Sequence, residues 1–121
     1  MGPFPIRIEI EKSGLLTGDS AVFLIWRKHK EASGDFVKTG NPYMKVVLTG
    51  EDGVEAVTAV IDNLDPDYYY LIEESGWSWK YTPDVLSIST EDQTMNPFKF
   101  KNTLKDVTTK NGEAKAKNEF F

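Results

Sequence analysis

The sequence contains no cysteine and only one histidine, His29. These absences exclude a disulfide framework, a thiolate zinc site, a cysteine nucleophile and most histidine-based acid–base chemistry. No run of about 18 apolar residues occurs, so the sequence predicts no insertion into a membrane. The net charge of −5 argues against a surface that binds nucleic acid. We expect no metal, no cofactor and no nucleic-acid partner.

The 121 residues are enough for one domain with a single core. Residues 1–4 are predicted to be a linker, and residues 5–121 a single domain. The start of the sequence lacks the charged and apolar parts of a signal peptide, and no cell-wall sorting motif follows. We therefore expect the chain to be a fragment of a longer protein.

Period-two alternation of apolar and polar residues dominates the sequence and predicts strands with one buried face. It is clearest from Ile6 to Lys12, where three isoleucines share one face and charged residues occupy the other. Residues 27–34 are predicted to be a loop, and residues 50–53 a turn that joins strands 43–49 and 54–61 in a hairpin. No segment has a helical period, so we predict an all-β sandwich of about seven or eight strands. The other segments with a strand-like pattern are 21–26, 68–73, 77–81, 85–89, 98–102 and 114–120.

Three polar residues fall on strand faces that the alternation predicts to be buried. Lys12 ends the isoleucine face, Glu73 shares a face with Tyr69 and Leu71, and Asn102 shares a face with two phenylalanines. A buried lysine, carboxylate or amide costs several kcal/mol unless it is paired or hydrogen-bonded. Three such residues in one small domain therefore predict that they meet.

Together these three groups could form a covalent bond. Burial disfavours charge, so a lysine and a carboxyl group can both be neutral near pH 7. A neutral amine is a nucleophile, and a protonated carboxyl can polarise the carbonyl of an asparagine side chain. The product would be a Lys–Asn isopeptide bond, with ammonia released in a single turnover that the fold promotes by proximity. Ordinary enzymatic turnover is not expected.

The sequence also resembles the B-type repeat of collagen adhesins (Cna-B), whose domains build the shafts of Gram-positive pilins. The resemblance lies in the opening Ile-x-Ile-x-Ile-x-Lys, in residues 17–23 (Thr-Gly-Asp-Ser-Ala-Val-Phe), in residues 63–73 and in residues 98–103. It implies an immunoglobulin-like (prealbumin-like) sandwich in an extracellular, cell-wall-attached surface protein. It also implies that Lys12 is the amine partner, Asn102 the amide partner and Glu73 the catalytic acid. The implied function is that of a structural stalk or adhesin module, monomeric, with neighbouring domains of the same protein as its partners.

Two assignments in this site remain open in the sequence. Glu74 adjoins Glu73, so a shift of one residue would exchange the catalytic acid. Asn118 also ends an alternating segment and is an alternative to Asn102 as the amide partner.

The alternative function is a binding module for a host matrix protein or a glycan. Trp77, Trp79 and Tyr81 alternate, so they share one strand face and could form an aromatic platform for sugars or for a partner's side chains. A hydrolase that uses Glu73, Glu74 and a nearby aspartate as a carboxylate pair is a third hypothesis, which no spacing favours.

Overall fold

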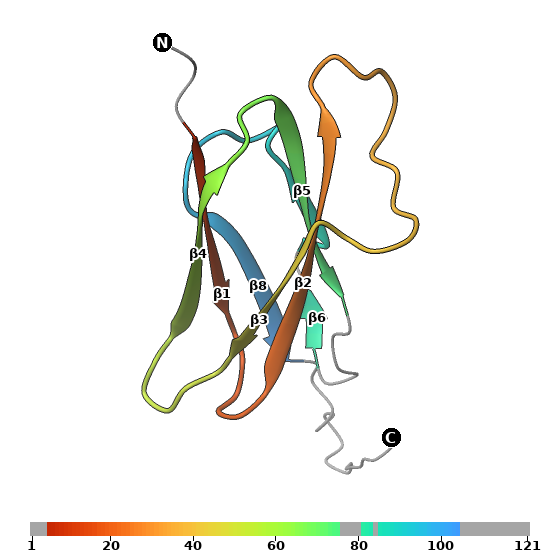
Figure 1. The fold of residues 1–121 in the computed structure, drawn as a ribbon. Coiled ribbons are helices and arrows are strands. Elements are labelled where there is room, and N and C mark those ends of the chain that lie inside the picture. The colour runs from red at the N-terminus through yellow and green to blue at the C-terminus, as the bar shows by residue number, and fades with distance from the viewer. Residues whose placement is uncertain (1–4, 76–80, 84, 105–121) are drawn as a thin grey trace.

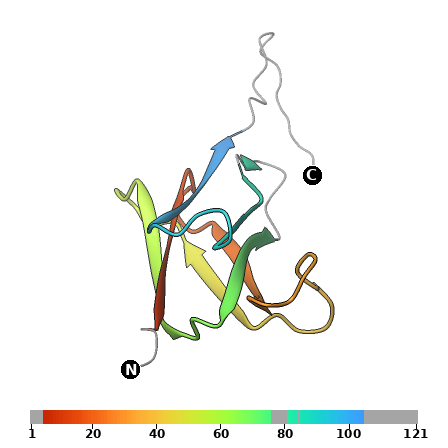
Figure 2. The ribbon, with the colours of Figure 1, turned by 90° about the horizontal axis from the view of Figure 1, so that it is seen from above.

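Eight strands form two four-stranded sheets in the computed structural model, which describes residues 5–75, 81–83 and 85–104 (Figure 1). One sheet has the strand order β4-β1-β8-β6 and the other has the order β3-β2-β5-β7. The sheets pack face to face, so the chain is an all-β sandwich, as the alternation predicts (Figure 2). The strands are β1 (Ile6–Ser13), β2 (Ser20–His29), β3 (Met44–Thr49), β4 (Ala56–Leu64), β5 (Tyr68–Ser75), β6 (Tyr81–Pro83), β7 (Ser87–Ser89) and β8 (Phe98–Leu104).

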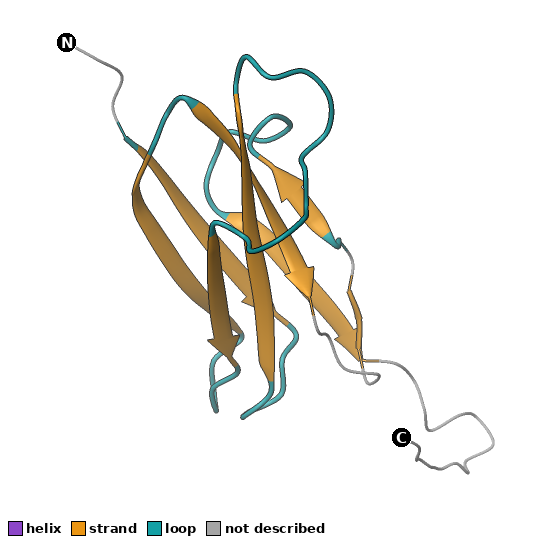
Figure 3. Cartoon of the chain, turned by 45° about the vertical axis from the view of Figure 1, so that its right-hand side comes forward, coloured by secondary structure: helices purple, strands orange, loops and turns teal. Residues whose placement is uncertain are grey.

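Helices are absent from the described ranges, and only loops connect the strands (Figure 3). Within those ranges, accordingly, no helix is long and apolar enough to cross a membrane.

The first and last described strands, β1 and β8, lie side by side and run parallel. Their register places Lys12 beside Phe100 and Ser13 beside Lys101. On its other side β1 pairs with β4 in the antiparallel direction, with an irregularity between Ile6 and Ile8. The end of β1 is thus held from both sides, in the middle of a sheet.

The core forms where the inward faces of the two sheets meet. Alternate residues of β1 and β8 contribute from one sheet, and alternate residues of β2 and β5 contribute from the other. The rings of Phe23 and Phe100 meet edge to face across the interior, with centroids 4.9 Å apart. Burial of these apolar side chains is the main stabilising contribution to the fold. The buried hydrophobic residues of this core are Ile8, Ile10, Ala21, Phe23, Ile25, Leu48, Ile61, Leu64, Tyr70, Ile72, Phe98 and Phe100.

Two local predictions are wrong. Strands β3 and β4 follow one another in the sequence but do not form a hairpin, because β3 pairs with β2 and β4 pairs with β1 in the opposite sheet. The turn at residues 50–53 therefore crosses between the sheets. Strand β2 continues to His29, so the loop begins at residue 30 rather than at Arg27. The extra residues of β2 pair with β5, with His29 beside Tyr68.

Candidate functional site

Lys12 is the centre of a buried polar cluster between the two sheets. Its side chain follows Ile8 and Ile10 on the inward face of β1, and its exposed fraction is 0%. The Lys12 Nζ donates a hydrogen bond to Asn102 Oδ1 at 2.6 Å and another to Glu74 Oε1 at 2.7 Å. One nitrogen therefore contacts both a carboxyl group and a carboxamide, out of reach of water.

Asn102 reaches this cluster from β8. It follows Phe98 and Phe100 on the inward face and is 3% exposed, as its parity predicts. Because β1 and β8 are parallel and adjacent, residues 90 positions apart in the sequence lie next to each other. Asn118, the alternative partner, lies outside the described residues.

The carboxyl group of the cluster belongs to Glu74 in β5, on the opposite sheet. Glu74 is 4% exposed and follows Tyr70 and Ile72 on the inward face of its strand. Its Oε1 accepts from Lys12, whereas Oε2 is buried with no hydrogen-bond partner among the described residues. An ionised carboxylate with one bare oxygen is costly in a dry interior. Moving a proton from Lys12 to Glu74 across their hydrogen bond would turn the ion pair into a neutral amine and a neutral acid.

The prediction that Glu73 lies on the buried face of its strand and meets Lys12 is wrong. Glu73 points to the outer face of the sheet, where its Oε1 accepts from the Trp26 indole at 3.0 Å and its Oε2 accepts from Lys38 Nζ at 2.7 Å. The Lys38 hydrogen bond is the main cause of a lowered pKa for Glu73, and Trp26 adds to it. Glu73 is thus an ionised residue of the outer face, where it bonds to Trp26 and Lys38, whereas the bonds to Lys12 come from Glu74 and Asn102.

The wrong parity has a physical cause. The stretch Tyr68-Tyr69-Tyr70-Leu71-Ile72 is apolar at every position, so alternation alone cannot tell which face is buried. The outer face is also partly covered, because Lys38, in the connection between β2 and β3, reaches back to Glu73 on this face. Lys38 is 35 residues from Glu73, and nothing in the sequence pattern pointed to this contact.

The predicted aromatic platform falls largely outside what the structure describes. Trp77 and Trp79 lie outside the described residues, and only the backbone of Tyr81 is placed, in β6. A different aromatic group was missed. The Arg27 guanidinium lies over the rings of Tyr43 and Tyr68, at 4.1 and 4.2 Å from their centroids, and His29 packs on Tyr68. These cation–π contacts hold the end of β2 against β5 and the start of β3.

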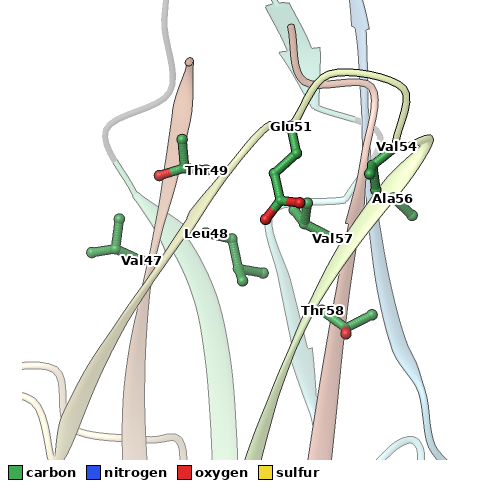
Figure 4. A pocket seen from close by; sticks show the side chains of 8 residues that line it. All are labelled: Val47, Leu48, Thr49, Glu51, Val54, Ala56, Val57 and Thr58. Carbon is green, nitrogen blue, oxygen red and sulfur yellow. The ribbon is translucent and has the colours of Figure 1, made fainter. Parts of the chain in front are cut away.

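A groove of about 480 Å³ lies between the edge strands β3 and β4 (Figure 4). Its walls are mostly valine, leucine and threonine side chains, with Glu51 at the turn (Figure 4). Val57 belongs to this wall and lies beside Lys12 in the sheet register, but Lys12 itself is fully buried. The groove therefore does not open onto the lysine. Within the described part of the chain, no three His, Asp or Glu residues gather in a way that could hold a metal ion.

Comparisons of the chain with protein-family models, with curated proteins and with solved structures give no match. The chain is a β-sandwich in which a buried lysine contacts a buried asparagine beside a buried glutamate, and its function has to be inferred from this geometry.

Proposed function

We propose that this domain is a structural module that closes its own fold with an isopeptide bond between Lys12 and Asn102. The observation that carries the proposal is the pair of short contacts from Lys12 Nζ, 2.6 Å to Asn102 Oδ1 and 2.7 Å to Glu74 Oε1, in a fully buried site. An uncharged hydrophobic contact would be a cheaper way to fill this space. A buried amine, acid and amide brought together have instead the composition that amide exchange requires.

The reaction begins with proton transfer from Lys12 to Glu74, which leaves a neutral amine. The Lys12 nitrogen attacks the Asn102 carboxamide carbon while the protonated Glu74 donates a hydrogen bond to the developing oxyanion. Glu74 then relays a proton from the attacking nitrogen to the departing nitrogen, the C–N bond of the carboxamide breaks, and ammonia leaves. One amide is lost and one is formed, so no oxidant, metal or cofactor enters the balance. Fixed geometry supplies the rate, because the groups are already in contact.

The bond would join residues that are 90 positions apart. By the loop-entropy treatment used for disulfides, a closed loop of that length stabilises the fold by roughly 4–5 kcal/mol, less any strain. This cross-link would also survive reduction, which suits a chain without cysteine. Together with the resemblance to Cna-B repeats, these features support a stalk or adhesin module of a bacterial cell-surface protein, located outside the cell and joined to neighbouring domains.

The decisive experiment is the intact mass of the protein under denaturing conditions. We expect the wild-type chain to be lighter than its sequence mass by one ammonia. Lys12→Ala, Asn102→Ala and Glu74→Gln are each expected to have full mass once the substitution is allowed for. Glu73→Gln is the matched control, because it makes the same chemical change one residue away on the other face, and it should keep the deficit.

Two results would contradict the proposal. One is a full mass for well-folded wild-type protein. The other is a linked peptide, mapped after proteolysis, that joins residues other than Lys12 and Asn102. Near-UV circular dichroism of each variant establishes that a full mass comes from a folded chain.

A further inference from the structure

Gly14 lies two residues after Lys12 and packs against the backbone of Asn102. It follows the last residue of β1 and has a φ of +84°, in the left-handed region that favours glycine. A Cβ built on Gly14 would lie 2.0 Å from the Asn102 carbonyl oxygen, 3.0 Å from its carbonyl carbon and 3.1 Å from its nitrogen. The whole Asn102 peptide therefore rests on the surface that a side chain at position 14 would occupy.

Gly14 is connected to both members of the reactive pair: it follows the strand that carries Lys12, and it packs on the backbone of Asn102. A side chain at position 14 would have to push the Asn102 backbone away or move the end of β1. The first movement displaces the carboxamide, and the second displaces Lys12, which is two residues earlier on the same strand. The atoms in the way are backbone atoms of a paired strand, so rotation of a flexible side chain cannot relieve the overlap. Either movement, by about 1 Å or more, would break the 2.6 Å contact between Nζ and Oδ1.

We propose that Gly14 is a positioning residue for the cross-linking reaction: its missing side chain lets Asn102 approach β1 closely enough for the carboxamide to meet Lys12. This inference rests on the proposed function. Gly14 does not touch the reacting atoms and acts only through the Asn102 backbone and the end of β1. A misplacement of about 1 Å can slow a reaction between fixed groups by about 100-fold.

The chain offers two matched controls. Gly18 has almost the same backbone conformation, with φ at +86°, but a Cβ there would meet no atom within 4 Å. Gly18→Ala therefore reproduces the backbone strain of Gly14→Ala without the overlap. Gly50→Ala reproduces an overlap elsewhere, because its Cβ would lie 2.3 Å from the Leu16 carbonyl oxygen. Together they separate strain and general overcrowding from displacement of the reactive pair.

The experiment measures the rate at which freshly made chains lose ammonia. Wild type, Gly14→Ala, Gly18→Ala and Gly50→Ala are produced by cell-free synthesis, translation is stopped, and intact mass is recorded at intervals. The folded fraction of each is measured in a Lys12→Met background, which cannot react, and the rates are divided by that fraction. The comparison is repeated in trimethylamine N-oxide, which favours the compact state, so that a weakly folding variant still gives a rate.

We expect the normalised rate of Gly14→Ala to fall by about 10- to 100-fold. Gly18→Ala and Gly50→Ala should remain within about threefold of wild type, since a Cβ at Gly18 would meet nothing and the nearest atoms to a Cβ at Gly50 belong to Leu15 and Leu16 rather than to Asn102. Equal normalised rates for Gly14→Ala and Gly50→Ala would overturn the inference and leave Gly14 with a purely structural role. Failure of the proposed function has a different signature, because the wild-type chain itself would then never lose ammonia.

Discussion

Stretching the domain by its two ends is expected to produce no unfolding extension when Lys12 and Asn102 are joined. Strands β1 and β8 are parallel, so the start of β1 and the end of β8 point to opposite ends of the sandwich (Figure 1). Tension applied through the ends passes down β1 to Lys12, crosses the new bond to Asn102 and leaves through the end of β8. The residues between positions 12 and 102 carry no load along this path.

The magnitude of the effect follows from the length of the closed loop. Lys12 and Asn102 are 90 positions apart, and an extended chain spans at most about 3.3–3.6 Å per residue. Breaking the sandwich open in an unlinked chain would therefore release roughly 300 Å of contour length. With the bond in place this length is locked, because a covalent bond does not yield at forces that shear the hydrogen bonds between strands.

Single-molecule force spectroscopy on tandem copies flanked by marker domains tests this prediction. Wild-type copies whose ammonia deficit has been verified by mass should contribute no unfolding step, so only the marker domains give peaks. Lys12→Ala and Asn102→Ala copies should each give a step of roughly 300 Å. Two substitutions on different strands are used so that the step cannot be attributed to a side effect of either one. A step of the same size in mass-verified wild-type copies would refute the load path derived from β1 and β8.

Two further predictions concern groups outside the cluster of Lys12, Glu74 and Asn102, and both are tested by urea unfolding as a function of pH. Glu73 lies on a part-exposed outer face, so Glu73→Gln should cost less than about 1 kcal/mol. Lys38 lowers the pKa of Glu73. The contribution of this ion pair to the free energy of unfolding is therefore present above the ordinary pKa of 4.5 and is lost as pH falls through the lowered pKa. The same loss of unfolding free energy at acid pH in Glu73→Gln and in wild type would contradict this prediction. Burial raises the pKa of Tyr70 above 10.0, so stability is complete below that value and declines as pH rises through the raised pKa. Tyr70→Phe should lack this alkaline decline. It should also lose about 1 kcal/mol of unfolding free energy at neutral pH, since the Tyr70 hydroxyl donates to the Asp65 carbonyl. The same loss of stability at alkaline pH in the variant and in wild type would count against this prediction.

Strand parity predicted the β1 and β8 contributions to the site because each of these strands has one clearly polar face. In β1, charged residues separate the isoleucines, so only one register buries apolar groups, and Lys12 is carried inward with them. The same holds for Asn102 beyond Phe98 and Phe100. In β5 both faces are apolar over five residues, so the choice between Glu73 and Glu74 depended on contacts from the other sheet and from Lys38, which local sequence does not encode.

The wrong hairpin has a related cause. A turn rich in glycine between two strands predicts pairing when the two strands stay in one sheet. Here the turn at residues 50–53 joins edge strands of opposite sheets, and their pairing partners are β2 and β1. Which sheet a strand joins is decided by the packing of the whole sandwich. The composition of the turn does not indicate which sheet the next strand joins.

The pairing of β1 with β8 also determines when during synthesis Lys12 and Asn102 can first meet. A ribosome makes Lys12 ninety residues before Asn102, so the lysine cannot meet this partner until nearly the whole described domain has been synthesised. A chain that is interrupted before β8 lacks the Asn102 carboxamide. A chain that is still extended through the ribosomal exit tunnel or a secretion channel cannot bring β1 and β8 together. Bond formation would therefore mark copies of this domain that have been made through β8 and have folded, and would leave unfinished copies open to proteases.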